Sequence, residues 1–118
     1  MKRNLTKERI IRKKTDIDAI FKAGKKYSFS CFKLLVKDNG LSYSRFMVIP
    51  VKHFGNSIER NKIRRQIKEI WRTHYEDVRP GVDCLVIVYN TCSKLNLTYI
   101  EKEKSLLNLL KVGGLLKA

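Results

Sequence analysis

The segment "KHFGNSIERNKIRRQIKEIWR", residues 52–72, places an apolar stripe and a charged stripe on one element. Gly55 permits unusual backbone angles, and Asn56 or Ser57 can cap a helix that begins there. Apolar side chains then recur at helical spacing within an arc of about 60°. The arc contains Ile63, Ile67, Ile70 and His74. We predict a helix over residues 57–75 that buries this arc.

A second arc of the same helix, about 100° wide, carries positive charge and no acidic residue. Its members are Asn61, Arg64, Arg65, Lys68 and Arg72. Glu59 and Glu69 fall outside it, so we expect neither to neutralise it. A solvated surface is the usual explanation for a charged helix face, but solvated faces normally mix both signs. The single sign favours a polyanionic partner.

Composition supports the same kind of partner. The 118 residues include 26 Lys and Arg against 11 Asp and Glu, which gives a formal charge of +15. The hydrophobic fraction is 43%, as in an ordinary globular protein. We predict a single domain over residues 1–118. Such a charge favours nucleic acid or an acidic membrane surface. Asn61, between Arg60 and Lys62, suggests directed hydrogen bonds to sugar or base edges, and arginine suits bidentate contacts with phosphate. Nucleic acid is therefore preferred over membrane.

The chain before this helix predicts one short helix and two or three strands. Residues 1–14 form a basic, extended arm, and Thr15 is the predicted N-cap of a helix that ends at Gly24. The apolar face of that helix consists of Ile17, Ile20 and Phe21. Residues 31–37 and 44–51 are predicted to be strands paired as a hairpin.

Three further signals complete the pattern. Pro50 lacks a backbone donor and belongs at a sheet edge, a bulge or a strand end. The segment "CLVIVY" that begins at Cys84 is apolar on both faces, as a central strand is. Thr98 and Glu101 have the spacing of a capping box for a last helix, which ends at Gly113. Leu106, Leu107 and Leu110 supply its buried stripe. We predict an α+β fold with one mixed sheet and helices packed on it.

The cysteines and the hydropathy pattern indicate where in the cell the protein is located. Cys31, Cys84 and Cys92 are too few and too scattered for a disulfide framework, so we predict free thiols. They also lack the ligand spacing of a zinc site. No apolar run has the length of a membrane span, and no signal-peptide core follows the basic N-terminus. We expect a cytoplasmic protein.

Residues 52–72 resemble the signature of the bacterial ribonuclease P protein subunit, which has a basic pair, Gly-Asn, Arg-Asn-Arg and paired basic residues along a helix. The resemblance extends to "DIDAIFKAG", to the predicted strands and to the last helix, about nine-tenths of the chain. Lys62 stands where the family normally has Arg, and Ile17 where a Phe is common. Pro50 and His53 are also unusual at their positions.

The resemblance implies a single-domain αβββαβα two-layer sandwich, a ribosomal protein S5 domain 2-like fold with a left-handed βαβ crossover. It also implies an RNA-binding subunit of a ribozyme. The partners would be the ribonuclease P catalytic RNA and precursor tRNA, whose 5′ leader is removed by an RNA that holds Mg²⁺ largely by itself. No metal site on the protein, no catalytic side chain, no membrane and no further protein partner are expected.

Two groups of residues match the family's contact positions. Those expected to contact RNA are Lys52, His53, Gly55, Asn56, Arg60, Asn61, Lys62, Arg64, Arg65 and Lys68. Those expected in the leader cleft are Ile17, Phe21 and Leu35. Apolar residues at such spacing are ordinarily core residues. Phe21 is the best cleft candidate because aromatic rings stack on unpaired bases.

Two other functions remain open. A protein-only nuclease would need clustered carboxylates or a positioned histidine, but the aspartates are dispersed and His74 lies on the apolar arc. A ribosomal or other structured-RNA-binding protein with no role in cleavage fits the composition equally well, and only residues 52–72 distinguish it.

Overall fold

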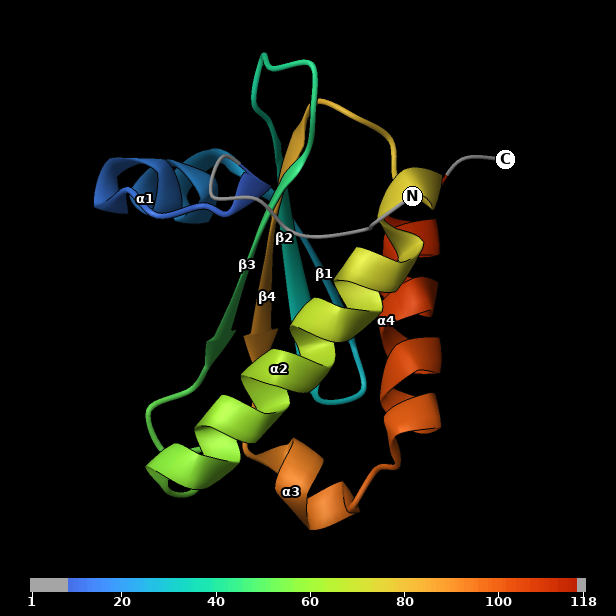
Figure 1. Ribbon diagram of the computed structural model, residues 1–118. Helices are drawn as coiled ribbons and strands as arrows, with labels where there is room; N and C mark the ends of the chain where they lie inside the picture. The colour runs from blue at the N-terminus through green and yellow to red at the C-terminus, as the bar shows by residue number, and fades with distance from the viewer. Residues whose placement is uncertain (1–8, 117–118) are drawn as a thin grey trace.

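The computed structural model describes residues 9–116, apart from the side chains of residues 93 and 94. The elements are α1 (Lys14–Ala23), β1 (Lys25–Phe29), β2 (Phe32–Asp38), β3 (Arg45–Pro50), α2 (Ser57–His74), the 3₁₀ helix η2 (Tyr75–Asp77), β4 (Val82–Val88), α3 (Thr91–Leu95) and α4 (Tyr99–Val112) (Figure 1). The predicted αβββαβα order is confirmed, with α3 as a short addition before α4. Most of the predicted basic arm, residues 1–8, lies outside the described residues.

The four strands form one mixed sheet in the order β1-β2-β4-β3. β2 pairs antiparallel with both β1 and β4, whereas β3 runs parallel to β4. The predicted hairpin of residues 31–37 with 44–51 is therefore wrong, because β4 lies between these two strands. β4 is apolar on both faces and is one of the two interior strands, and Pro50 ends the edge strand β3 as predicted.

The hairpin partner of β2 is β1, a strand that the sequence pattern allowed for but did not locate. Ser30 turns the chain between the two strands with a φ of 57°, in the left-handed region. β1 has the sequence KKYSF and is largely exposed. It lacks the longer apolar alternation by which a half-buried strand is recognised. It is a strand because its backbone groups form hydrogen bonds with those of β2.

The connection β3–α2–β4 is left-handed, as the family resemblance implied. In Figure 1 both strands point downward, β4 lies to the right of β3, and α2 crosses in front of the sheet. About 98% of such crossovers are right-handed. General rules of chain geometry alone would have predicted the opposite hand here.

The sheet buries its two faces to different extents. The main core cluster lies on the face covered by α2 and α4, and it includes Phe32, Phe46, Ile67 and Leu109. The opposite face has a smaller cluster beneath α1, consisting of Ile11, Ile20, Leu35 and Leu85. No other described helix packs on that second face to a comparable extent. Part of it therefore stays open to solvent.

The ends of the helices differ in part from prediction. α1 begins at Lys14, and Ile17 N–H already donates to Lys13 O at 3.1 Å, so Thr15 lies inside the helix and is not its N-cap. Gly24 ends α1 as predicted. Its N–H donates to Ile20 O at 2.8 Å, and a Cβ there would lie 2.5 Å from the same oxygen.

The C-terminal helix follows its sequence signals more closely. Thr98 and Glu101 form the predicted capping box, and Gly113 is the C-cap. Leu106 and Leu110 are buried, whereas Leu107 is half-buried. Within residues 9–116, no helix has both the length and the hydropathy to cross a membrane.

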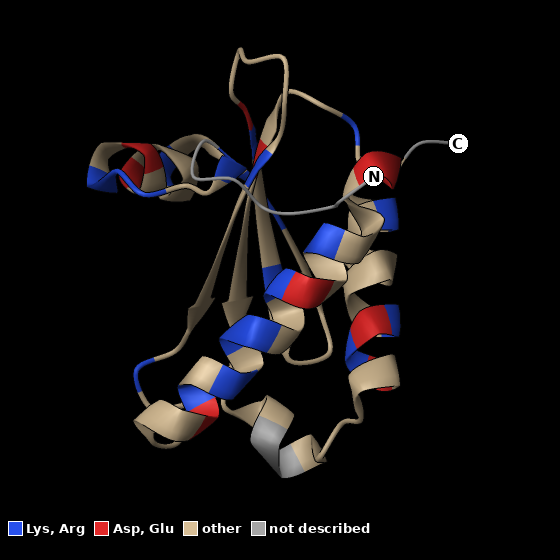
Figure 2. Ribbon diagram, in the orientation of Figure 1, with Lys and Arg blue, Asp and Glu red and all other residues tan. Residues whose placement is uncertain are grey.

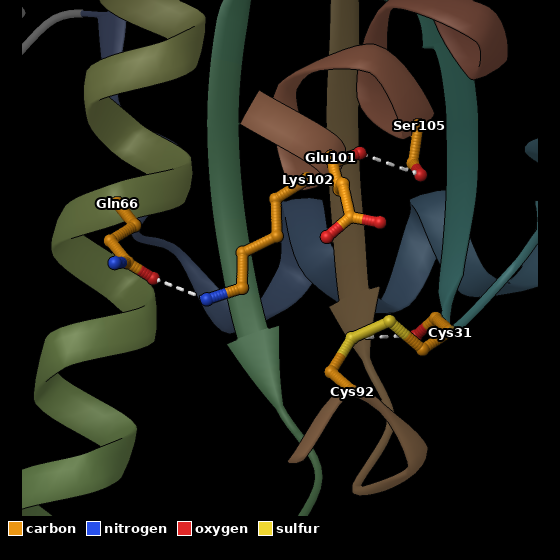
Figure 3. The surroundings of a disulfide bond; sticks show 6 residues. All are labelled: Cys31, Gln66, Cys92, Glu101, Lys102 and Ser105. Atoms are coloured by element: carbon orange, nitrogen blue, oxygen red, sulfur yellow. Dashed lines mark hydrogen bonds between the residues drawn. A yellow bond between two sulfur atoms is a disulfide. The ribbon is translucent and has the colours of Figure 1, made fainter. Parts of the chain in front are cut away.

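The prediction of free thiols is wrong for two of the three cysteines. Cys31, in the β1–β2 turn, and Cys92, in α3, form a disulfide across 61 positions of sequence (Figure 3). The two residues are far apart along the chain, so their spacing gave no indication of the contact. Cys84 is free and fully buried in β4, where burial raises the pKa of its thiol.

Candidate nucleic-acid interface

The loop before α2 is built to start that helix sharply. Asn56 is the N-cap, and its side chain accepts a hydrogen bond from Glu59 N–H at 2.9 Å. Glu59 Oε1 in turn accepts from Asn56 N–H at 3.3 Å. Gly55 has a φ of +67°, and a Cβ there would lie 2.7 Å from Glu59 Oε1. Gly55 and Asn56 therefore have a structural role that is independent of any RNA contact.

The buried face of α2 fixes which residues point outward. Ile63, Ile67, Ile70 and Trp71 are buried. The ring of Trp71 stacks on Phe46 of β3, with centroids 4.6 Å apart. His74, which the sequence placed on this arc, is half-buried, and its Nε2 lies 2.9 Å from Glu103 Oε2 of α4. With this face against the sheet, the basic arc must face away from it.

The outward face of α2 forms a shallow depression with a polar and basic lining. Its lining residues are Ile58, Asn61, Arg64, Arg65 and Lys68. Arg64 Nη1 donates to Asn61 Oδ1 at 2.9 Å, so the amide holds the guanidinium in place. Figure 2 shows the basic positions following one another along α2. Four predicted RNA-contact residues are thus brought together on one surface.

Ile58 is the member of this surface that sequence reasoning missed. It is the second residue of α2, and it is 75% exposed. An isoleucine so exposed beside three cations contributes nothing to the core and offers an apolar contact for a sugar or base. Its position one turn before Asn61 and two turns before Arg65 was the available signal.

Arg60 connects the basic surface to the preceding loop. Its Nη1 lies 3.4 Å from Lys52 O and 3.3 Å from Gly55 O. Both carbonyls belong to the loop that contains the predicted contact residues Lys52 and His53, which are exposed. Arg60 thereby holds the loop beside the helix, so that loop and helix present one continuous basic edge.

Lys62 does not share the depression of the other basic residues. Its side chain lines a separate groove together with Gln66 of α2 and Lys102 of α4. At 100° per residue, Lys62 lies on the flank of α2 nearer α4. The sequence motif therefore divides into two surfaces, and only the packing of α2 against α4 could show this.

Arg72 departs from the predicted basic arc. Its Nε donates to Glu69 Oε2 at 3.0 Å, and its Nη2 contacts the other carboxylate oxygen. The hydrogen bond from Arg72 lowers the pKa of Glu69. The prediction that Glu69 neutralises no part of the arc is therefore wrong at Arg72, since residues three apart on a helix face each other. The unopposed part ends at Lys68.

The predicted leader-binding residues lie on the other side of the molecule. Phe21, on α1, is 40% exposed, and Ile17 is half-buried against the smaller core cluster. Leu35 is fully buried in that cluster, so it supports the surface from beneath and does not line it. Half-buried apolar side chains of the same sheet face continue this surface. They are Met47, Ile49 and Ile87.

Lys33 adds a cation to this second surface, and the sequence did not single it out. It pairs directly with Ile87 in the β2–β4 register, so the two side chains share a face. Lys26 pairs with Leu35 in the same way on β1. An exposed aromatic ring, an apolar floor and two lysines are what an unpaired nucleic-acid strand requires.

Comparison with known proteins gives a consistent result. The family model described as "Ribonuclease P" matches residues 5–112. The ribonuclease P protein component of Thermotoga maritima is 33% identical over 113 residues, covering 94% of this chain and 97% of that protein. The corresponding protein of Borreliella burgdorferi is 39% identical over 104 residues, 86% of this chain and 83% of that protein.

Solved structures give the same answer for the fold. The Thermotoga maritima ribonuclease P protein, in complex with a fluorophenyl thiourea, matches with a TM-score of 0.81 and 34% identity over 86% of this chain and 96% of that one. A Staphylococcus aureus ribonuclease P protein mutant matches with a TM-score of 0.85 and 26% identity, over 92% of this chain and 91% of that one. The chain therefore belongs to the ribonuclease P protein family, the protein subunits of an endoribonuclease.

Proposed function

We propose that this chain binds the catalytic RNA of ribonuclease P through the outward face of α2 and the loop before it. The residues proposed to make these contacts are Lys52, His53, Gly55, Asn56, Arg60, Asn61, Lys62, Arg64, Arg65 and Lys68. One observation carries the proposal. The depression on α2 has three cations in its lining and no carboxylate, and Arg60 holds the loop beside it. Such single-sign clustering matches the repeating charge of a phosphate backbone.

The second part of the proposal concerns precursor tRNA. We place its 5′ leader on the surface formed by α1 and the open face of the sheet, with Phe21 stacking on an unpaired base. Ile17 would pack beside it, with Leu35 supporting both from below. The lysines of the sheet, Lys33 and Lys26, would meet leader phosphates. Sequence-tolerant binding by stacking and charge suits a leader that differs between tRNAs.

The chemistry of leader removal is assigned to the RNA. In this proposal Mg²⁺ is held mainly by the RNA, no protein side chain is catalytic, and the protein contributes affinity and orientation. We place the complex in the cytoplasm, with no membrane contact and no further protein subunit needed. Positive charge near the RNA phosphates also lowers their mutual repulsion, so the protein should reduce the Mg²⁺ concentration that cleavage requires.

Reconstitution tests the proposal directly. The purified chain is added to the ribonuclease P RNA encoded in the same genome, and precursor-tRNA cleavage is measured at low Mg²⁺. We expect the protein to restore cleavage that the RNA alone does not support. Cleavage by the protein without RNA would instead support a protein-only nuclease. Binding of ribosomal RNA in preference to ribonuclease P RNA would support a ribosomal role.

A further inference from the structure

A groove between α2 and α4 lies beside the α2 depression. It is closed at one end by α3. Its lining residues are Phe54, Glu59, Lys62, Ile63, Gln66, Cys92, Asn96, Leu97 and Lys102. The floor is apolar, and most of the rim is polar. The groove has a volume of about 260 Å³, which is more than enough for one phosphate group with its bound water.

Two cations converge in this groove from different helices. Lys62 extends from α2 and Lys102 from α4, and Lys102 Nζ donates to Gln66 Oε1 at 2.8 Å (Figure 3). Burial lowers the pKa of Lys102, and the positive charge of Lys62 lowers it further. Lys102 is thus held in the groove at some cost to its charged form, an arrangement that a bound anion would relieve.

The groove does not supply that anion itself. Among the described residues, no carboxylate forms an ion pair with Lys62 or Lys102. Glu59 is the one acidic residue in the lining, and its Oε1 is engaged by Asn56 N–H in the helix cap. The neutral Gln66 fixes the position of Lys102 without neutralising it. The net charge of the lining is therefore positive.

The position of the groove indicates which anion it meets. Lys62 directly follows Asn61, which lines the depression on the outward face of α2. An RNA backbone that crosses this depression needs only to bend around one flank of α2 to place its next phosphates over Lys62 and Lys102. A rigid surface that offers two cations from two helices fixes the path of a strand better than one helix face does.

We propose that this groove is a second phosphate-binding site for RNA, in which Lys62 and Lys102 jointly hold a backbone phosphate and Gln66 positions Lys102. This rests on the proposed function and extends it, because α4 and Lys102 become part of the RNA interface. No bond is made or broken at the site. Its effect is to determine where the RNA leaves the face of α2.

The test uses the full chain and the ribonuclease P RNA encoded in the same genome. Lys102→Gln should weaken binding about fivefold and lower the slope of log affinity against log salt by about 0.7–0.9, the value for one lost phosphate contact. Lys104→Gln is the matched control, since it removes the same charge from an exposed position on the same helix. It should change both quantities much less.

A double-variant cycle separates joint action from independent action. If Lys62 and Lys102 hold one phosphate, Lys102→Gln should have little further effect in a Lys62→Gln background. It should have its full effect in an Arg65→Gln background, because Arg65 lines the other surface. Full additivity of Lys62→Gln with Lys102→Gln would overturn the shared site.

Labelling of the unmodified protein gives a readout that does not depend on folding of a variant. Amine-reactive labelling of Lys62 and Lys102 should fall when the RNA is bound, whereas Lys104 should react equally in both states. Equal labelling of Lys102 with and without RNA would overturn this site alone, provided that Arg64→Gln still weakens binding. If neither Arg64→Gln nor Lys102→Gln weakens RNA binding, the proposed function fails as well.

Discussion

Arg45 on β3 and Asp83 on β4 are joined by two hydrogen bonds across neighbouring parallel strands. Arg45 Nε donates to Oδ1 at 2.8 Å and Nη2 to Oδ2 at 2.6 Å. Asp83 is only 4% exposed, and Asn39 also donates to its Oδ1, at 3.0 Å. Arg45 Nη1 reaches Asp16 Oδ2 of α1 at 3.3 Å. The pair therefore connects the sheet to the helix that carries Phe21.

Removal of this pair should be costly. Asp83→Ala leaves the half-buried guanidinium of Arg45 without its main partner, and we expect a loss of roughly 2–4 kcal/mol in the free energy of unfolding. Asp38→Ala is the control, since Asp38 has an 82% exposed side chain and lies 3.6 Å from Arg79. Urea denaturation should show a loss below about 1 kcal/mol for the control. Equal losses in the two variants would contradict a special role for Asp83.

The disulfide predicts a dependence of stability on redox conditions. The loop that it closes spans 61 positions, and a cross-link of that length typically stabilises a fold by about 2–5 kcal/mol. Cys31→Ser combined with Cys92→Ser, or treatment of the oxidised protein with a thiol reductant, should lower the melting temperature accordingly. Cys84→Ser is not a suitable control, because Cys84 is buried in the sheet.

The reductant itself provides the control for this prediction. It should not change the melting temperature of the Cys31→Ser, Cys92→Ser variant. The oxidised fraction in cells should depend on the compartment, because disulfides are rare in a reducing cytosol. Mass spectrometry after rapid thiol blocking in cells would measure the oxidised fraction. No change in melting temperature on reduction of the purified protein would contradict the stabilising role.

The local parts of this structure were predictable from sequence, and the long-range parts were not. The isoleucine period and the Asn56 cap lie within one segment, so α2 could be located almost to the residue. The pairing of β2 with β4 instead of β3, and the bond between Cys31 and Cys92, depend on how distant segments pack. No periodicity encodes such contacts.

The same distinction applies to the candidate site. Charge and helical spacing predicted that Arg64, Arg65 and Lys68 share a face. They did not show that Lys62 and Lys102 line the same groove, because α4 is far away in sequence. Nor did they separate Phe21, which is exposed, from Leu35, which is buried. Burial is decided by packing around a residue, which a motif match does not describe.

The α2 depression gives a prediction about RNA affinity. Arg64→Ala combined with Lys68→Ala should weaken binding to ribonuclease P RNA and lower the log–log salt slope by about 1.4–1.8, the value for two lost phosphate contacts. The fold should survive, because the hydrogen bond described for Arg64 joins it to Asn61 on the same exposed face. Filter binding at several salt concentrations, together with thermal melting, measures both effects.

The matched control removes two charges elsewhere. Lys104 and Lys111 are exposed on α4, outside the depression and the groove. Their joint replacement by Ala changes the net charge by the same amount and should lower affinity only slightly. If both double variants lose equal affinity, the RNA senses the overall charge of the protein and the α2 depression is an ordinary solvated surface.

Phe21 provides the sharpest test of leader binding, because its neighbour Ile20 shows what a core residue on the same helix looks like. Ile20 is fully buried, whereas Phe21 is 40% exposed. Ile20→Ala should cost about 2–5 kcal/mol of stability, and Phe21→Ala much less than the ~3–5 kcal/mol of a buried Phe. Thermal melting of the two variants checks this difference first.

The functional effect of Phe21→Ala should depend on the leader. A lost base–aromatic stack is typically worth ~1–3 kcal/mol, so affinity for precursor tRNA should fall about fivefold to over a hundredfold. Affinity for leaderless tRNA should hardly change. Phe29→Ala is the matched control and should affect neither tRNA form. The Phe29 ring is 45% exposed on β1. Its cross-strand partner Phe32 belongs to the core cluster on the sheet face that α2 and α4 cover, away from α1. If Phe21→Ala lowers the melting temperature strongly and affects both tRNA forms alike, its ring belongs to the core and the leader lies elsewhere.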